Sequence, residues 1–124
     1  MRQSLIDLPL FDVAQITSLR NALGEEDLRD MLLQFPDAAA EAFNNIATAS
    51  RSKDLEEVRH LAHALKGLAA SFGAGRLAAI ACEFELEAAS IAAVMQRMPA
   101  LTDAIDATLA ALPDIAGAPS GAKL

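Results

Sequence analysis

The residues best suited to chemistry lie at positions 63 to 67, where the chain reads His63-Ala64-Leu65-Lys66-Gly67. On a helix, side chains three and four positions apart lie on one face, about one turn from each other. His63, Lys66 and Gly67 would therefore lie together. A histidine that accepts a phosphoryl group needs a ring nitrogen with a free lone pair, a cation beside the incoming anion, and open space for its partner. The pentapeptide offers all three, although the same residues also occur by chance in helical proteins without such chemistry.

The spacing of apolar residues places His63 on the side of this helix that faces away from the core. With about 100° per residue and Leu65 at zero, the apolar side chains from position 55 to 72 fall between roughly −60° and +80°, and His63 falls at about 160°. We expect His63 to be the phosphoacceptor and Lys66 to offset the charge of the phosphoryl group, with help from Arg59. The surface on which a partner would dock is formed by Arg59, His60, Gly67, Ala70 and Ser71.

A metal-binding alternative rests on Glu57-Val58-Arg59-His60, a Glu-x-x-His arrangement like those of di-iron helix bundles. Such bundles need two of these motifs and two further glutamates. The chain has two histidines, and the second, His63, has a histidine instead of a glutamate three positions before it. We therefore expect no metal site. Cys82 has no histidine or basic residue at neighbouring helical spacing to activate its thiol, so we expect it to be structural.

The residues around the pentapeptide extend the pattern, which resembles the histidine-containing phosphotransfer (HPt) domain over residues 9–112. After the pentapeptide, the resemblance is carried by Ala69, Gly73-Ala74, Arg76-Leu77-Ala78 and Phe84-Glu85. Before it, the matching residues are Leu19, Leu23-Gly24-Glu25-Glu26-Asp27, Phe35, Asp54, Arg59 and Ala62-His63. Leu68 departs from the family, many of whose members carry a small polar residue there, often serine. A hydroxyl hydrogen bond near the phosphate is therefore not expected from that position.

The resemblance implies a phosphorelay intermediate in two-component signalling. His63 would accept a phosphoryl group from the aspartate of a response-regulator receiver domain and pass it to another receiver, with a hybrid histidine kinase among the partners. Mg²⁺ would be bound by the receiver, and the chain would need no cofactor of its own. It contains no glycine-rich phosphate loop of the P-loop or kinase kind, so we expect no kinase activity. Two alternatives remain: a helical interaction module without relay chemistry, and the phosphoacceptor domain of a larger histidine kinase.

Composition narrows the function further. The chain has 124 residues, 53% of them apolar, and a net charge of −7. A negative charge disfavours non-specific binding to nucleic acid and to anionic membranes. No stretch approaches the roughly 18 apolar residues of a membrane span, and no signal-type segment follows the first residues. The single cysteine excludes an internal disulfide and fits a reducing compartment. We expect a free-standing, soluble, cytoplasmic monomer with one domain over residues 1–124.

Helical periodicity predicts the elements that must position the site. A first helix should begin after Asp12 as N-cap and stop at Gly24. A second should run from position 25 to 49, kinked at Pro36 but not ended by it, because its apolar seam continues in phase. Leu33 lies about 140° from that seam, where we expect the first helix to cover it in preference to its forming a docking patch. A third helix should follow Asp54, which would form a reciprocal capping box with Glu57.

The remaining elements complete an all-α architecture. The third helix, which carries His63, should be closed by Gly73 as a C-terminal cap. A fourth helix should start near Gly75 and a fifth should span residues 91–112, with a link near residues 88–90 and a bend or a later start at Pro99. No run alternates with period two, so no strands are expected. We predict an antiparallel four-helix bundle with an additional short N-terminal helix, a helical core over residues 9–112 and a flexible tail over 113–124.

Overall fold

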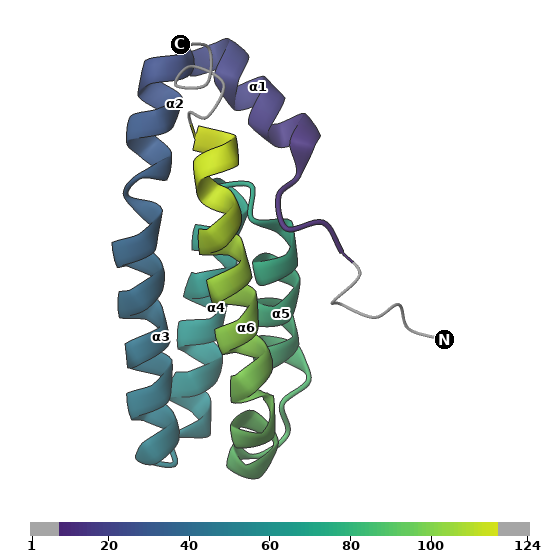
Figure 1. Ribbon diagram of the computed structural model, residues 1–124. Helices are drawn as coiled ribbons and strands as arrows, with labels where there is room; N and C mark the ends of the chain where they lie inside the picture. The colour runs from purple at the N-terminus through teal and green to yellow at the C-terminus, as the bar shows by residue number, and fades with distance from the viewer. Residues whose placement is uncertain (1–7, 117–124) are drawn as a thin grey trace.

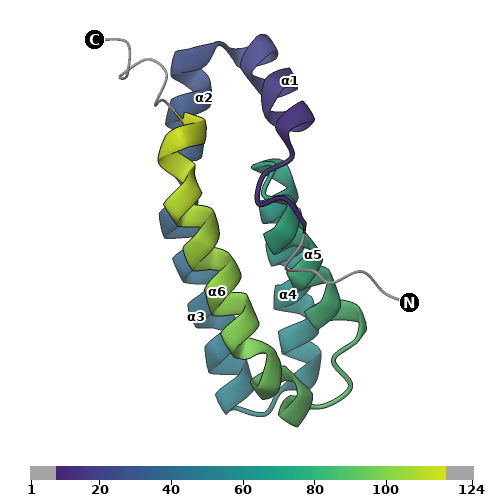
Figure 2. The same ribbon diagram turned by 45° about the vertical axis from the view of Figure 1, so that its right-hand side comes forward.

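A computed structural model describes residues 8–116, which form six α-helices and contain no strand. Their bounds are α1 (Val13–Leu23), α2 (Glu25–Leu32), α3 (Phe35–Arg51), α4 (Leu55–Ser71), α5 (Gly75–Leu86) and α6 (Ile91–Ala116). Figure 1 shows α3, α4, α5 and α6 side by side, each antiparallel to the next, with α2 continuing the line of α3. Figure 2 shows α1 crossing one end of this bundle. The predicted all-α bundle with an additional N-terminal helix is confirmed.

The second predicted helix is interrupted, so the expectation of a single kinked helix was wrong. α2 ends at Leu32, residues Leu33 and Gln34 form a turn, and α3 begins at Phe35 with Pro36 in its first turn. Proline has no N–H, and its ring clashes with the carbonyl four residues earlier, which belongs here to Leu32. The apolar seam nevertheless stays in phase across the turn, since Leu28, Leu32 and Phe35 are all fully buried.

Leu33 is 59% exposed, so the prediction that the first helix covers it was also wrong. The reason lies in the way α1 is held. The Asp12 N–H donates to the Gly73 carbonyl at 2.8 Å, and the Gln15 side-chain amide donates to the Ala70 carbonyl at 2.7 Å. Both bonds draw the start of α1 over the connection between α4 and α5. Leu33, in the turn between α2 and α3, is left uncovered.

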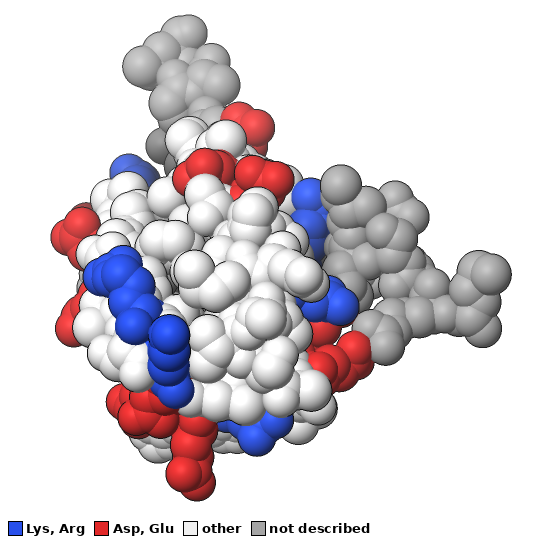
Figure 3. Space-filling model, turned by 90° about the horizontal axis from the view of Figure 1, so that it is seen from below, with Lys and Arg blue, Asp and Glu red and all other residues white. Residues whose placement is uncertain are grey.

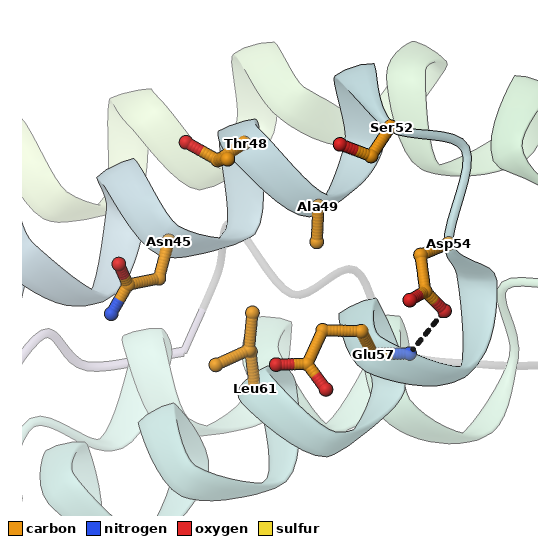
Figure 4. Close-up of a pocket in the computed structure, with 7 residues that line it drawn as sticks. All are labelled: Asn45, Thr48, Ala49, Ser52, Asp54, Glu57 and Leu61. Atoms are coloured by element: carbon orange, nitrogen blue, oxygen red, sulfur yellow. Dashed lines mark hydrogen bonds between the residues drawn. The ribbon is translucent and has the colours of Figure 1, made fainter.

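Capping residues set the ends of the helices much as predicted. Asp12 accepts a hydrogen bond from the Gln15 N–H, and Asp54 accepts one from the Glu57 N–H at 3.1 Å (Figure 4). The reciprocal half of the capping box is not formed. Instead, the Asp54 N–H donates to the Ala49 carbonyl at 3.0 Å, because the chain leaves α3 through Lys53 with a φ of 61° and brings that amide back onto the end of α3.

The connection between α4 and α5 closes on Gly73, as expected. Gly73 has a φ of 73°, and its N–H donates to the Ala70 carbonyl while the Ala74 N–H donates to the Ala69 carbonyl. These two bonds form a Schellman motif, which satisfies carbonyls at the end of a helix. They turn the chain within three residues, and α5 therefore packs directly alongside α4.

The last helix is longer than predicted. α6 starts at Ile91, where the Ser90 hydroxyl accepts a hydrogen bond from the Ala93 N–H, and it passes through Pro99 and Pro113 to Ala116. The flexible tail expected over 113–124 is therefore wrong for residues 113–116, which are helical. Residues 117–124 lie outside the described part of the chain. Seen from the end that carries the α3–α4 and α5–α6 connections, basic and acidic side chains lie around the rim of the bundle (Figure 3). Across residues 8–116, no helix combines the length and apolarity needed to span a bilayer.

The Gly73 turn yields a stability prediction. In Gly73→Ala, an L-residue would take a left-handed conformation, and its Cβ would lie 3.0 Å from the Ile16 Cδ1 atom. We expect a loss of about 1–3 kcal/mol in the free energy of unfolding, measured by urea denaturation. Gly75→Ala is the control, because its Cβ would meet only the Pro9 carbonyl at 3.7 Å. Equal stability of the two variants would contradict the assignment of Gly73 as the strained position.

Candidate functional site

His63 lies on the outer face of α4, opposite the residues by which this helix joins the core. The His63 side chain is 65% exposed. The core-facing residues of α4 are at most 1% exposed, namely Val58, Ala62, Leu65 and Ala69. The apolar spacing of α4 explains this division, because residues at helical spacing pack inward and the intervening positions point outward. The imidazole is therefore accessible to another macromolecule.

Glu85 of α5 joins the two residues that the sequence suggested for chemistry. Its Oε2 atom lies 2.7 Å from His63 Nδ1, and its Oε1 atom lies 2.9 Å from Lys66 Nζ. One carboxylate thus contacts both the imidazole and the ammonium group. His63 and Lys66 lie one turn apart on α4, and the packing of α5 against α4 brings Glu85 between them.

Within this cluster, Glu85 and Lys66 each favour the charged form of the other. The hydrogen bond to Lys66 lowers the pKa of Glu85 despite its partial desolvation, and His63 adds to that shift. The same bond to Glu85 raises the pKa of Lys66. At neutral pH the pair is therefore a carboxylate and an ammonium ion. As the pH falls through the lowered pKa of Glu85, the carboxylate is protonated and its attraction for both partners weakens.

The contact to Glu85 also selects the form of the imidazole. An ionised carboxylate accepts hydrogen bonds and donates none, so the ring nitrogen beside it carries a hydrogen. In the neutral imidazole this places the proton on Nδ1 and the free lone pair on Nε2. The cluster can therefore hold an exposed histidine with Nε2 ready to act as a nucleophile and with a cation one helical turn away.

Arg59 does not join this cluster. Its Nη2 atom donates to the Ala88 carbonyl at 2.9 Å, which ties α4 to the connection between α5 and α6. Its position on the same face of α4 suggested that it would help Lys66 at the phosphate. In the structure, its guanidinium instead has a structural role, because it holds α4 to the connection between α5 and α6. Ala88 lies 29 positions away in another connection, and helical spacing within α4 does not indicate such a contact.

The residues expected to form a docking surface are all exposed, and four of them also take part in side-chain hydrogen bonds, namely Arg59, Gly67, Ala70 and Ser71. Gly67 has open space where a Cβ would be, with no atom within 4 Å. The Ser71 hydroxyl donates to the Gly67 carbonyl at 2.9 Å, and the Ala70 carbonyl accepts the bond from Gln15. His60 is exposed near the start of the same face. Gly67, Ala70 and Ser71 leave a surface of small side chains C-terminal to His63.

Glu85 is the one residue of this cluster to which the sequence assigned no role. It lies 22 positions from His63, and no periodicity within α4 can indicate which residue of another helix will contact that face. The Phe84-Glu85 pair was part of the family resemblance, and that was the only available signal. Leu68, the departure from the family pattern, packs against the core. Within residues 8–116 no group of three or more potential metal ligands occurs, and Cys82 is half-buried.

The contact between Glu85 and His63 yields a prediction for the imidazole. In Glu85→Ala the Nδ1 proton loses its acceptor, so we expect a smaller share of the Nδ1–H tautomer at alkaline pH. The measurement is the pair of ¹⁵N chemical shifts of the His63 ring. Glu41→Ala, which removes an exposed carboxylate from α3, is the control. An unchanged tautomer ratio in Glu85→Ala would show that the carboxylate does not select the form of the ring.

Comparison with known families gives an independent assignment. The family model described as Hpt domain matches residues 14–111, which include α2 to α5 completely and most of α1 and α6. Neither a search of curated proteins nor a search of solved structures found a match. Hpt domains are helical bundles that interact with receiver domains, and they act as phosphotransfer intermediates, not as kinases. Because the match spans most of its length, the chain belongs to the Hpt domain family, whose function is histidine phosphotransfer in phosphorelays.

Proposed function

We propose that His63 accepts a phosphoryl group from the aspartate of one receiver domain and passes it to the aspartate of another. The observation that carries this proposal is the Glu85 carboxylate, which contacts both His63 Nδ1 and Lys66 Nζ. It supports Nε2 as the nucleophile, because the Nδ1 side of the ring is occupied. The exposure of the imidazole supports transfer between two proteins, since the partner must bring its aspartate to the ring.

The transfer needs one bond to form and one to break. The Nε2 lone pair of His63 attacks phosphorus in line, the P–O bond to the partner's aspartate breaks, and the electron pair of that bond leaves with the carboxylate. The ring keeps its Nδ1 hydrogen and gains positive charge, which the Glu85 carboxylate at 2.7 Å offsets. In the second half of the relay, a receiver's carboxylate attacks the same phosphorus and Nε2 leaves with its lone pair.

Lys66 stabilises the phosphoryl group during this exchange. Its ammonium lies one turn beyond His63, and the phosphoryl group brings nearly two negative charges to that face. A charge-assisted contact between the two would be stronger than a neutral hydrogen bond. The Mg²⁺ that assists transfer belongs to the receiver in this proposal, so the chain contributes a nucleophile, a carboxylate and a cation.

The assignment of His63 is tested by labelling. We expect that His63→Gln takes no label from phosphorylated receiver domains, whereas His60→Gln is labelled at the wild-type level. His60 is exposed on the same helix but lacks a basic residue three positions later, and it therefore serves as the matched control. The label should be acid-labile, as a phosphoramidate is. Wild-type labelling of His63→Gln, or loss of label in His60→Gln alone, would overturn the assignment.

Substitutions at Gly67 distinguish a role in partner docking from a role in helix packing. Because a Cβ there would meet nothing within 4 Å, we expect Gly67→Ala to be neutral or to stabilise the fold by up to about 1 kcal/mol through helix propensity. Gly67→Gln should also fold, yet it should slow transfer from a receiver by obstructing the approach to His63. A thermal melt and a transfer assay on both variants provide the measurements. Full transfer activity in a stable Gln variant would mean that the partner approaches from elsewhere.

A further inference from the structure

A groove between α3 and α4 begins beside His63. It consists of two adjoining hollows of about 290 Å³ and 450 Å³, which share Asn45 and Leu61 in their linings. The first hollow reaches Ala64 and Leu68, the sequence neighbours of His63 and Gly67. The second continues toward the α3–α4 connection, and Figure 4 shows Ala49 and Leu61 pointing into the space between the two helices. The groove thus adjoins the surface on which a partner of His63 must dock.

The chemistry of this groove is acidic over an apolar floor. Three carboxylates lie along it, those of Glu41, Asp54 and Glu57, and all three residues are exposed. No lysine, arginine or histidine lines either hollow, although the Arg51 guanidinium donates to the hydroxyl of the lining residue Thr48 at 3.3 Å. The floor is formed by small and aliphatic side chains, namely Ala38, Ala42, Ala49, Leu61, Ala64, Leu65 and Leu68. A partner that binds over this floor comes close to the carboxylates, and lysine or arginine side chains on the partner would offset their charge.

The opposite side of His63 has a different electrostatic character. Lys66 and Arg59 both turn toward α5, where Lys66 contacts Glu85 and Arg59 donates to the Ala88 carbonyl. His63 therefore lies between the paired Lys66 and Glu85 on its α5 side and the carboxylates of the groove on its α3 side. The anionic phosphoryl group is best accommodated beside Lys66. The surface that surrounds it on the partner must then extend over the carboxylates of the groove.

We propose that the α3–α4 groove binds a basic and apolar surface of the receiver domain, adjacent to the receiver's phosphorylated aspartate, and so determines which receivers exchange phosphoryl groups with His63. The proposal rests on the function proposed for His63. With a net charge of −7, the chain repels acidic partners, so complementary charge beside the site favours receivers that carry lysine or arginine there. Opposite charges across an interface mainly raise the rate of encounter and discriminate among partners.

The test neutralises the net charge of the groove without touching α4. Glu41→Lys/Asn45→Lys adds three positive charges on the exposed side of α3, and Ala100→Lys/Asp103→Lys adds the same charge on exposed positions of α6. A panel of phosphorylated receiver domains is first assayed with the wild-type protein, and the fastest donor is used for both variants. We expect the groove variant to raise KM about tenfold, with a smaller change in kcat, and the α6 variant to stay within about twofold of wild type. Added salt should raise KM for wild type more than for the groove variant.

The outcomes distinguish this proposal from the proposed function. Wild-type protein is also treated with phosphoramidate, a small phosphodonor that needs no docking surface. If phosphoramidate labels His63 but no receiver does, the function proposed for His63 fails, and the groove proposal falls with it. If receivers label the wild type but the groove and α6 variants show the same KM, the groove proposal alone is overturned. Glu41→Gln, which removes one charge without adding another, should raise KM in the same direction by a smaller factor.

Discussion

The site depends on the close packing of α4 against α5. The sharp turn at Gly73 joins these two helices, and small buried side chains such as Ala62, Ala69 and Ala81 allow their axes to approach. Only this arrangement brings a residue from the far end of α5 to the outer face of α4, where it contacts both His63 and Lys66. If the sequence of α5 were displaced by one residue, Glu85 would turn by about 100° around the helix axis and leave that face.

Much of the fold could be predicted because it depends on local chemistry. The caps at Asp12, Asp54 and Gly73 follow from side-chain and backbone preferences of single residues. The division of α4 into a buried and an exposed face follows from helical spacing alone. These features need no knowledge of which helices are neighbours, and each of them agrees with the structure.

Several features that were mispredicted, or not predicted, depend on contacts between distant parts of the chain. Leu33 is exposed because α1 is held over the α4–α5 connection, and nothing in the spacing of the first helix indicates its direction. Arg59 shares a face with Lys66, yet its guanidinium donates to a carbonyl in another connection. The break before Pro36 is of a different kind, because proline rules permit both a kink and a new helix start, and the in-phase seam does not discriminate between them.

The sharing of one carboxylate by two partners has a thermodynamic consequence. In the resting protein, Glu85 compensates the charge of Lys66. When Nε2 carries a phosphoryl group, as proposed, the lysine can pair with phosphate while Glu85 stays with the ring, which has become positive. In each form every charged side chain then has an opposite charge beside it, and the change between the two forms is an exchange of partners within the same three side chains. Such an exchange narrows the free-energy gap between the loaded and unloaded states, which is what a carrier requires if phosphoryl groups are to pass through it in either direction.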